Sequence, residues 1–341
     1  MITIENLEKE LKNNELKSIY SLYGEELFLL DNIVKKIKNK FGDLIKGINY
    51  ISIDENSYKS LISEIETPAF GYEKKLIIIK NAGILSSEGK RKNVEISNYR
   101  DILIKYLKEN IKSFEKNVIL IFIENSADTR LKIYKTLDEL GIVCKFEFQK
   151  LPQIKARIKA ICNGYKVIID ENTLTYFIES CGTSMQELIN EIRKLIEYVG
   201  ENGKIEKKDI DNLSTKKFES VIFDLTDNLG KKDIKTSLTV LRNLVYAKEP
   251  VQKILITLYN HFKKIYLTKK AEEYRKDIAT TLELKPNQVF LVNKYKNQAR
   301  MFRQEDLRQI LKSLADLDYN YKSGLINLDI GLESILCAYC S

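Results

Sequence analysis

The turn that follows the first predicted strand is the place in this chain where a nucleotide phosphate could bind. It comes after Tyr23 and reads Gly24, Glu25 and Glu26. A phosphate-binding loop needs several glycines, so that backbone N–H groups can reach the phosphates, and a lysine that neutralises them. Here one glycine is followed by two carboxylates, which suit the N-terminal end of a helix but repel a nucleotide. The sequence therefore predicts that the chain itself binds no nucleotide, and we expect no cofactor.

The other residue patterns that indicate catalysis or metal binding are also absent from the sequence. His261 is the only histidine, which removes histidine-based triads and His-rich metal sites. Cys337 and Cys340 have the spacing of half a zinc site, but no second pair or nearby histidine completes four ligands. Asp316 and Asp318 lie on a predicted helix, and we interpret them as part of a solvated face. We therefore expect no catalytic residue and no metal site.

A tight bend is the other unusual feature of the sequence, and it consists of Pro68, Ala69, Phe70 and Gly71. Pro68 disfavours a helical conformation for the residue before it, and Gly71 permits a sharp return of the chain. Two interpretations of the phenylalanine remain open at this point. Aromatic residues in the loops of compact domains are most often packed into the core, which is the commoner case. An exposed Phe70 would instead be a hydrophobic plug for a pocket on a partner.

The first 150 residues alternate between strands and helices. Short apolar runs predict strands at residues 18–23, 48–53, 76–79, 118–123 and 142–148, and apolar residues at helical spacing predict the helices between them. Such alternation is typical of a mostly parallel sheet with helices on both faces. The fourth of these strands is followed by Glu124, where a nucleotide-binding domain can carry a pair of magnesium-binding acids. Because no phosphate loop is present, we interpret Glu124 as a charge at the end of a strand.

No strand pattern continues beyond residue 151, and the rest of the chain is predicted to be helical. A small helical module precedes residue 214, in the size range of a lid or accessory domain. The helical stripes after it show no repeat at a fixed period, which favours a bundle over a solenoid. The predicted fold class is α/β plus all-α in three domains: a parallel-sheet domain at 1–150, a small helical lid at 151–213 and a helical bundle at 214–341.

Composition narrows the class of protein. The chain has 341 residues, of which 44% are hydrophobic and 30% charged, as expected for a globular protein of two or three domains. No apolar run is long enough to span a membrane, and the N-terminus has no secretory signal pattern. Five cysteines, an odd number, argue against a disulfide framework and for the reducing cytoplasm.

Positive charge is concentrated towards the C-terminus. The formal net charge is +8, and residues 214–341 carry 22 Lys and Arg against 15 Asp and Glu. The most basic cluster lies in or just after one predicted helix and consists of Lys263, Lys264, Lys269 and Lys270. Such a cluster either lies close to DNA or is a solvated helix face, and the sequence leaves both interpretations open.

The order of these parts and several motifs resemble the delta subunit of the bacterial DNA polymerase III clamp loader. The similarity runs essentially from end to end, with motifs at residues 20–29, 70–81, 128–135, 190–195, 222–225 and 318–324. Each motif is weak alone, but their order and spacing together are specific. The resemblance implies an AAA+-like fold without a functional phosphate loop, in which residues 214–341 form a collar domain for oligomerisation.

In that family the delta subunit binds the ring-shaped sliding clamp, the beta subunit, and opens one interface so that the ring can be loaded on primed DNA. The resemblance implies that Pro68, Ala69, Phe70 and Gly71 make the clamp contact. Phe70 would be the main anchor, because Ala69 stands where the family often carries Leu or Phe. The collar would join delta-prime and the tau/gamma-type ATPase subunits, which bind the ATP. The chain would have no catalytic site of its own within a DNA-directed DNA polymerase, a nucleotidyltransferase.

Two other functions remain open on the sequence. The basic C-terminal part would suit a stand-alone nucleic-acid-binding protein of replication or repair. The α/β part would suit, less well, a nucleotide-dependent ATPase with an unusual phosphate site. A closer rival is a delta-prime-type subunit, but that subunit usually carries a zinc-binding cysteine cluster and an arginine-bearing Ser-Arg-Cys motif, and this sequence contains neither.

Overall fold

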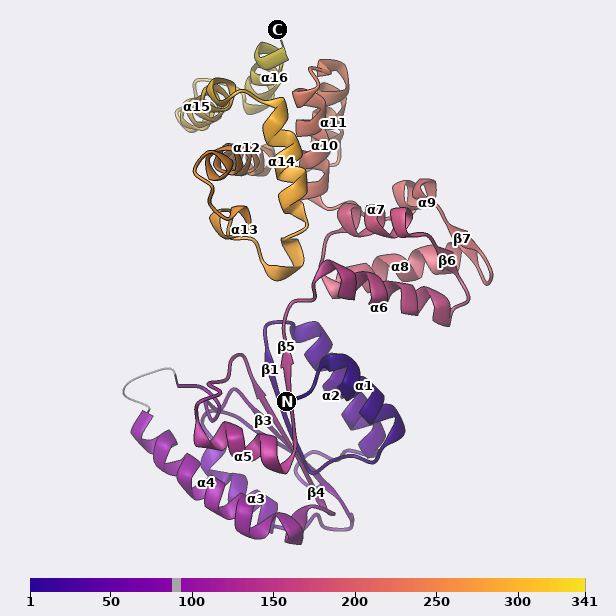
Figure 1. Cartoon of the computed structure of the whole chain (residues 1–341), viewed down its shortest axis with the longest axis vertical. Helices are drawn as coiled ribbons and strands as arrows, with labels where there is room; N and C mark the ends of the chain where they lie inside the picture. The colour runs from indigo at the N-terminus through magenta and orange to yellow at the C-terminus, as the bar shows by residue number, and fades with distance from the viewer. Residues whose placement is uncertain (88–92, 341) are drawn as a thin grey trace. The chain divides into compact units, whose positions relative to one another are not determined.

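A computed structural model describes residues 1–87 and 93–340 of the chain. The chain divides into two compact units, Met1–Phe148 and Gln149–Ser341, each with a hydrophobic core of its own (Figure 1). The second unit contains both of the segments that the sequence predicts as separate lid and bundle domains. Among the described residues, no helix is long and apolar enough to cross a membrane.

The described part of the first unit contains a five-stranded parallel sheet in the order β2-β3-β4-β1-β5. Its strands are β1 (Ile19–Gly24), β2 (Tyr50–Ile53), β3 (Lys75–Lys80), β4 (Val118–Glu124) and β5 (Ile142–Phe146). Strands β1 and β4 are buried along their whole length, because helices cover the sheet on both faces. This burial explains why they read as continuous apolar runs, and the predicted parallel sheet is confirmed.

The helices of the first unit lie on opposite faces of this sheet (Figure 1). One face carries α1 (Ile4–Asn13) and α2 (Leu27–Phe41); the other carries α3 (Leu61–Glu66), α4 (Asn93–Phe114) and α5 (Lys132–Leu140), with the 3-10 turn η1 (Tyr58–Ser60) before α3. Helix α1 is absent from the sequence prediction. Its signals are a buried stripe of Ile4, Leu7 and Leu11 and an N-cap in which Thr3 Oγ1 accepts the N–H of Asn6 at 3.2 Å.

The second unit begins with helices, as predicted, but it also contains a small sheet. The helices are α6 (Leu151–Gly164), α7 (Glu171–Cys181), α8 (Met185–Val199) and α9 (Lys207–Leu213). Between them, β6 (Ile168–Ile169) pairs in parallel with β7 (Lys204–Ile205). The expectation that strands stop at residue 151 is therefore wrong. Each of these strands has two residues, too few to produce an alternating pattern.

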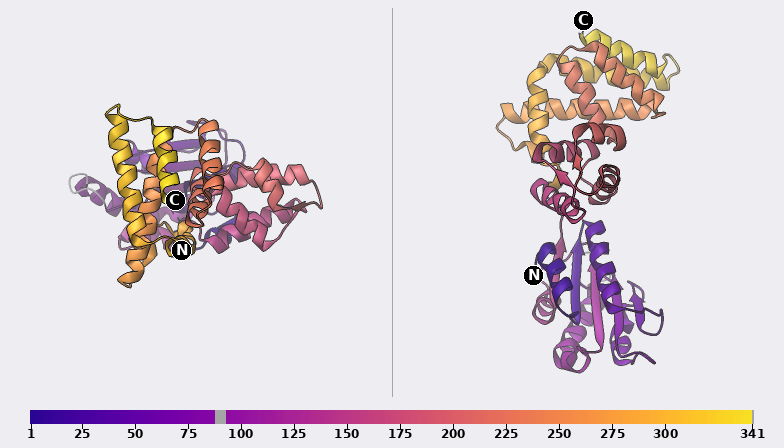
Figure 2. Two further views of the ribbon diagram at one scale, coloured as in Figure 1. Left: turned by 90° about the horizontal axis from the view of Figure 1, so that it is seen from above. Right: turned by 90° about the vertical axis from the view of Figure 1, so that its right-hand side faces the viewer.

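The rest of the second unit is a helical bundle arranged around α12, which contacts α10, α13, α14, α15 and α16 (Figure 2). Its elements are α10 (Phe218–Gly230), α11 (Ile234–Tyr246), α12 (Val251–Glu273), α13 (Ile278–Thr281), η2 (Pro286–Gln288), α14 (Leu291–Met301), α15 (Gln304–Lys322) and α16 (Leu328–Cys340). Polar contacts join this bundle to α7. The backbone N–H of Lys217 donates to the carbonyl of Ser180 at 2.8 Å, and Lys294 forms an ion pair with Glu179 at 2.8 Å.

The only histidine of the chain belongs to the interior of this bundle. His261 on α12 is buried, and its Nε2 donates to Gln298 Oε1 at 2.7 Å. Gln298 Nε2 in turn donates to the carbonyl oxygen of Phe223 at 3.1 Å and to Thr226 Oγ1 at 2.9 Å. Burial lowers the pKa of His261 to about 4, against a smaller opposing effect of the Gln298 hydrogen bond. The imidazole is therefore a neutral structural group that holds three helices together.

We expect His261 to stay neutral well below the usual histidine pKa. Its single imidazole Hε1 signal in the proton NMR spectrum should keep its position between about pH 7.5 and pH 5, whereas the unfolded chain should titrate near pH 6.5. Because the unfolded state binds this proton first, His261 should make the folded state less stable as the pH falls from about 6.5 towards 4, by roughly 3 kcal/mol. A native titration midpoint near the model-peptide value would contradict this prediction.

Candidate functional site

The turn at Gly24 is closed against the neighbouring strand β5. Gly24 has a φ of 135°, and a Cβ atom there would lie 2.2 Å from the carbonyl oxygen of Phe146. The backbone N–H of Glu26 donates to the same oxygen at 3.0 Å. The glycine is therefore required by the close approach of two chain segments, and one amide that a phosphate would need is already bonded. The geometry of the turn agrees with its sequence in disfavouring a nucleotide.

Glu124, at the end of β4, is a buried structural carboxylate. Its Oε1 accepts the backbone N–H of Ile84 at 3.0 Å, and only 6% of the residue is exposed. The Arg100 side chain donates to backbone carbonyl oxygens of the same loop. Its Nε donates to the carbonyl oxygen of Ile84 at 2.8 Å, and its Nη2 donates to that of Gly83 at 2.6 Å. Burial raises the pKa of Glu124, while the loop amides and Arg100 act in the opposite direction. The interpretation of Glu124 as a plain strand-end charge is corrected: its carboxylate holds the β3–α4 loop.

The remaining candidate ligands do not converge on a site. Cys337 is exposed and Cys340 half-buried on α16, and Asp318 on α15 forms an ion pair with Lys322 at 2.7 Å. Within residues 1–87 and 93–340, no group of three or more His, Cys, Asp or Glu side chains could hold a metal ion.

The bend after α3 exposes its phenylalanine to solvent. Phe70 is 91% exposed, whereas Ala69 beside it is half-buried. The N–H of Tyr72 donates to the carbonyl of Ala69 at 3.1 Å, and Gly71 has a φ of 77°, which a residue with a side chain rarely adopts. The core-packing interpretation of Phe70 is therefore wrong. The bend presents a single large apolar side chain at its apex.

Lys75, the first residue of β3, holds this bend in place. Its side chain is 4% exposed, and Nζ donates to the carbonyl oxygen of Glu64 at 2.8 Å, to Glu64 Oε2 at 3.0 Å and to the carbonyl oxygen of Thr67 at 3.2 Å. The ammonium group thus accounts for carbonyl groups of the last turn of α3 and of its C-cap residue Thr67, which precedes the bend directly. Sequence reasoning missed this role. The sequence contained one indication of this role, because Lys75 directly precedes the apolar residues of a predicted strand. A lysine that is buried at such a position needs a partner for its charge.

The four lysines of the predicted basic cluster do not form one surface. They are distributed around α12, since successive residues advance by about 100° around a helix, and they are Lys263, Lys264, Lys269 and Lys270. Lys269 Nζ donates to the carbonyl oxygen of Ala299 at 2.8 Å, and Lys270 forms an ion pair with Glu273 at 2.6 Å. This arrangement favours the solvated-face interpretation over a dedicated phosphate-binding patch.

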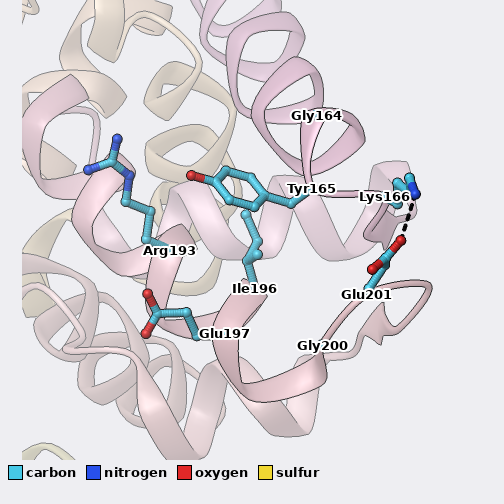
Figure 3. A pocket seen from close by; sticks show the side chains of 8 residues that line it. All are labelled: Gly164, Tyr165, Lys166, Arg193, Ile196, Glu197, Gly200 and Glu201. Atoms are coloured by element: carbon cyan, nitrogen blue, oxygen red, sulfur yellow. Dashed lines mark hydrogen bonds and ion pairs between the residues drawn. The ribbon is translucent and has the colours of Figure 1, made fainter.

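A broad pocket of about 700 Å³ lies in the second unit between the end of α6 and α8 (Figure 3). Figure 3 shows the ring of Tyr165 beside Ile196, and Lys166 paired with Glu201 at 2.6 Å. Arg193 also lines the pocket, so cationic and anionic side chains alternate along its wall. No sequence motif pointed to it. Its lining residues do not place a nucleophile next to a base, so no catalytic arrangement is recognised in this pocket.

Comparison with known families decides between the functions that the sequence left open. Residues 20–147 match the family described as "DNA polymerase III, delta subunit", and residues 219–339 match "DNA polymerase III delta subunit, C-terminal domain". The chain belongs to the DNA polymerase III delta subunit family. The resemblance inferred from the motifs is confirmed. As a member of this family, the chain is a non-catalytic subunit of a polymerase complex that functions in DNA replication.

Individual relatives cover nearly the whole chain. It is 25% identical to the DNA polymerase III subunit delta of Bacillus subtilis over 336 residues, 96% of this chain and 94% of that protein. It is 27% identical to the probable DNA polymerase III subunit delta of Aquifex aeolicus, over 88% of this chain and 85% of that protein. The solved structure of a Bacillus subtilis DNA clamp loader delta protein superposes with a TM-score of 0.75 at 24% identity, covering 99% of each chain. The predicted AAA+-like α/β plus all-α fold class is confirmed; the clamp contact at Pro68–Gly71 stays a prediction.

We expect Lys75→Met to loosen the bend, because it removes a buried ammonium and leaves two backbone carbonyls and Glu64 without their donor. The free energy of unfolding of the first unit should fall by about 2 kcal/mol. Chymotrypsin should also cleave after Phe70 faster in the variant, as followed by mass spectrometry of the fragments. Lys74→Met is the matched control, because the neighbouring Lys74 side chain is exposed. Equal cleavage rates in the two variants would contradict the role assigned to Lys75.

Proposed function

We propose that this delta-family chain is the clamp-loader subunit that binds the ring-shaped sliding clamp and opens one of its interfaces for loading on primed DNA. The observation that carries the proposal is Phe70, which is 91% exposed at the apex of a bend held by the buried ammonium group of Lys75. An isolated phenylalanine in that state has no structural use within its own unit. Burying it in a partner's pocket is worth about 2 to 3 kcal/mol in transfer free energy.

The neighbours of Phe70 support its assignment as the anchor. Pro68 fixes the backbone before the ring, and the hydrogen bond from the Tyr72 N–H to the carbonyl of Ala69 closes the bend around it, so the ring loses less conformational freedom when it binds. Ala69 contributes little area because it is small and half-buried. The clamp contact therefore depends mainly on one aromatic ring, as is common for binding hot spots.

The rest of the chain suits a subunit that transmits force without hydrolysing ATP. The turn at Gly24 is closed onto β5, so we assign ATP binding to the tau/gamma-type partner subunits. The helical region that contains residues 219–339 would join these subunits and delta-prime in a collar. A clamp bound to the first unit could then be pulled by the assembly, in the cytoplasm and next to primed DNA.

The two alternative functions are less well supported. A stand-alone DNA-binding protein needs converging cations, whereas Lys269 and Lys270 are engaged by other groups of the chain. An ATPase needs a phosphate loop, and Glu25 and Glu26 stand where the phosphates would lie.

Phe70→Ala should weaken binding to the host's sliding clamp by about 100-fold or more, because it removes the apolar anchor of the contact. Calorimetric titration of the full chain with the clamp measures this, and the thermal unfolding of the variant should match that of the unmodified chain. Ile102→Ala is the matched control, since Ile102 is also an exposed apolar residue of the first unit, at 58%. Unchanged clamp affinity in Phe70→Ala would reject the proposed function.

We further expect the isolated chain to show no saturable heat on titration with ATP and magnesium up to roughly millimolar concentrations, because the backbone amide of Glu26 is already bonded and two carboxylates flank the turn. A dissociation constant in the micromolar range would instead favour the ATPase alternative.

A further inference from the structure

A groove of about 400 Å³ lies beside the exposed bend. One wall is the segment from Ile65 to Lys75, which includes the bend itself, and the other is the C-terminal half of α4 with the residues that lead into β4. The groove and Phe70 are therefore parts of one continuous surface, because Pro68 and Ala69 line the groove and precede Phe70 directly. A partner that encloses Phe70 comes to lie over the mouth of this groove.

The wall contributed by α4 combines an aromatic ring with a hydrogen-bond acceptor. Tyr106 is half-buried and stacks on Phe114, with ring planes 5° apart and centroids 6.4 Å apart. Asn110 donates through Nδ2 to the carbonyl oxygen of Tyr106 at 3.0 Å, and its own Oδ1 is an acceptor. An aromatic face next to an amide oxygen is an arrangement that favours cations over anions.

Negative charge comes from the opposite wall. Glu66 and Glu73 both line the groove and are exposed, one at each end of the bend. Burial and then the charge of Glu66 raise the pKa of Tyr106, which indicates that the Glu66 carboxylate lies near the phenol. Lys75 also lines the groove, but its ammonium is buried and bonded to Glu64. The groove thus presents two carboxylates, an aromatic ring and an amide oxygen.

We infer that this groove receives a basic side chain, an arginine or a lysine, from the same protein partner that encloses Phe70. The inference rests on the proposed function, because it identifies that partner by the surface around the bend. A guanidinium or ammonium group would lie over Tyr106 and between Glu66 and Glu73, where cation–π attraction and charge-assisted hydrogen bonds act on the same group. Phe70 then supplies apolar anchoring, and the groove fixes the orientation of the partner about it.

The test compares two double variants of the full chain that remove the same charge. Glu66→Gln with Glu73→Gln neutralises the groove; Asp101→Asn with Glu109→Gln neutralises two exposed acids of α4 outside it. Calorimetric titration with the sliding clamp should show about 3- to 30-fold weaker binding for the groove variant only. The difference between the two variants should shrink as salt rises from about 0.05 M to 0.5 M, because screening weakens a charge contact.

Variants of Tyr106 separate the contribution of the ring from that of the fold. Tyr106→Phe should bind the clamp like the unmodified chain, whereas Tyr106→Leu should bind severalfold more weakly at unchanged thermal stability. Equal, salt-independent affinities of the two double variants, while Phe70→Ala still abolishes binding, would overturn the groove inference and leave the proposed function intact. Clamp binding that survives Phe70→Ala would overturn the proposed function, and the groove inference with it.

Discussion

The buried ammonium group of Lys75 is the interaction on which the exposed surface of the first unit depends. It ties the first residue of β3 to the last turn of α3 and to Thr67, the residue that precedes the bend. A charge at 4% exposure is tolerated only because carbonyl and carboxylate oxygens surround it. The sheet beneath supplies the rigidity, since β3 is paired on both sides. A flexible loop would lose most of the binding energy of Phe70 to conformational entropy, and this anchored bend avoids that loss.

Two positions where a nucleotide-binding domain contacts phosphate or magnesium, the turn at Gly24 and the strand end at Glu124, have structural roles in this chain. Gly24 lets the end of β1 approach the end of β5 closely, and the carbonyl of Phe146 in β5 accepts the N–H of Glu26. Glu124 accepts the amide of Ile84 in the loop after β3. In both places the polar groups that would meet a phosphate or a metal are satisfied within the protein. The parallel sheet therefore gives stiff support to the exposed bend that we propose as a binding surface.

The second unit uses buried polar groups in a comparable way. His261 and Gln298 connect three helices of the bundle, and Lys294 and Glu179 connect the bundle to α7. Such contacts have a definite geometry, so they select one arrangement of helices whose apolar faces alone would allow several. A region with this construction suits a subunit that must keep its shape while partners pull on it.

Sequence alone missed helix α1 and the short strands β6 and β7, but it determined the alternation of strands and helices between residues 18 and 148, the mainly helical nature of the remainder, the absent phosphate loop and the bend at Phe70. These are local properties, because side-chain periodicity and Pro or Gly constraints act within a few residues. The sequence motifs also identified the family. Each motif is weak alone, but together they occur in the order and spacing that the family shows. Tertiary structure decided that Phe70 is exposed, that Lys75 and Glu124 are buried, and that Tyr106, Glu66 and Glu73 share one groove. The reason is physical: burial and polar pairing depend on segments that are distant along the chain, from 11 residues for Lys75 and Glu64 to 111 for Tyr23 and Tyr134, and no local pattern specifies which of them will meet.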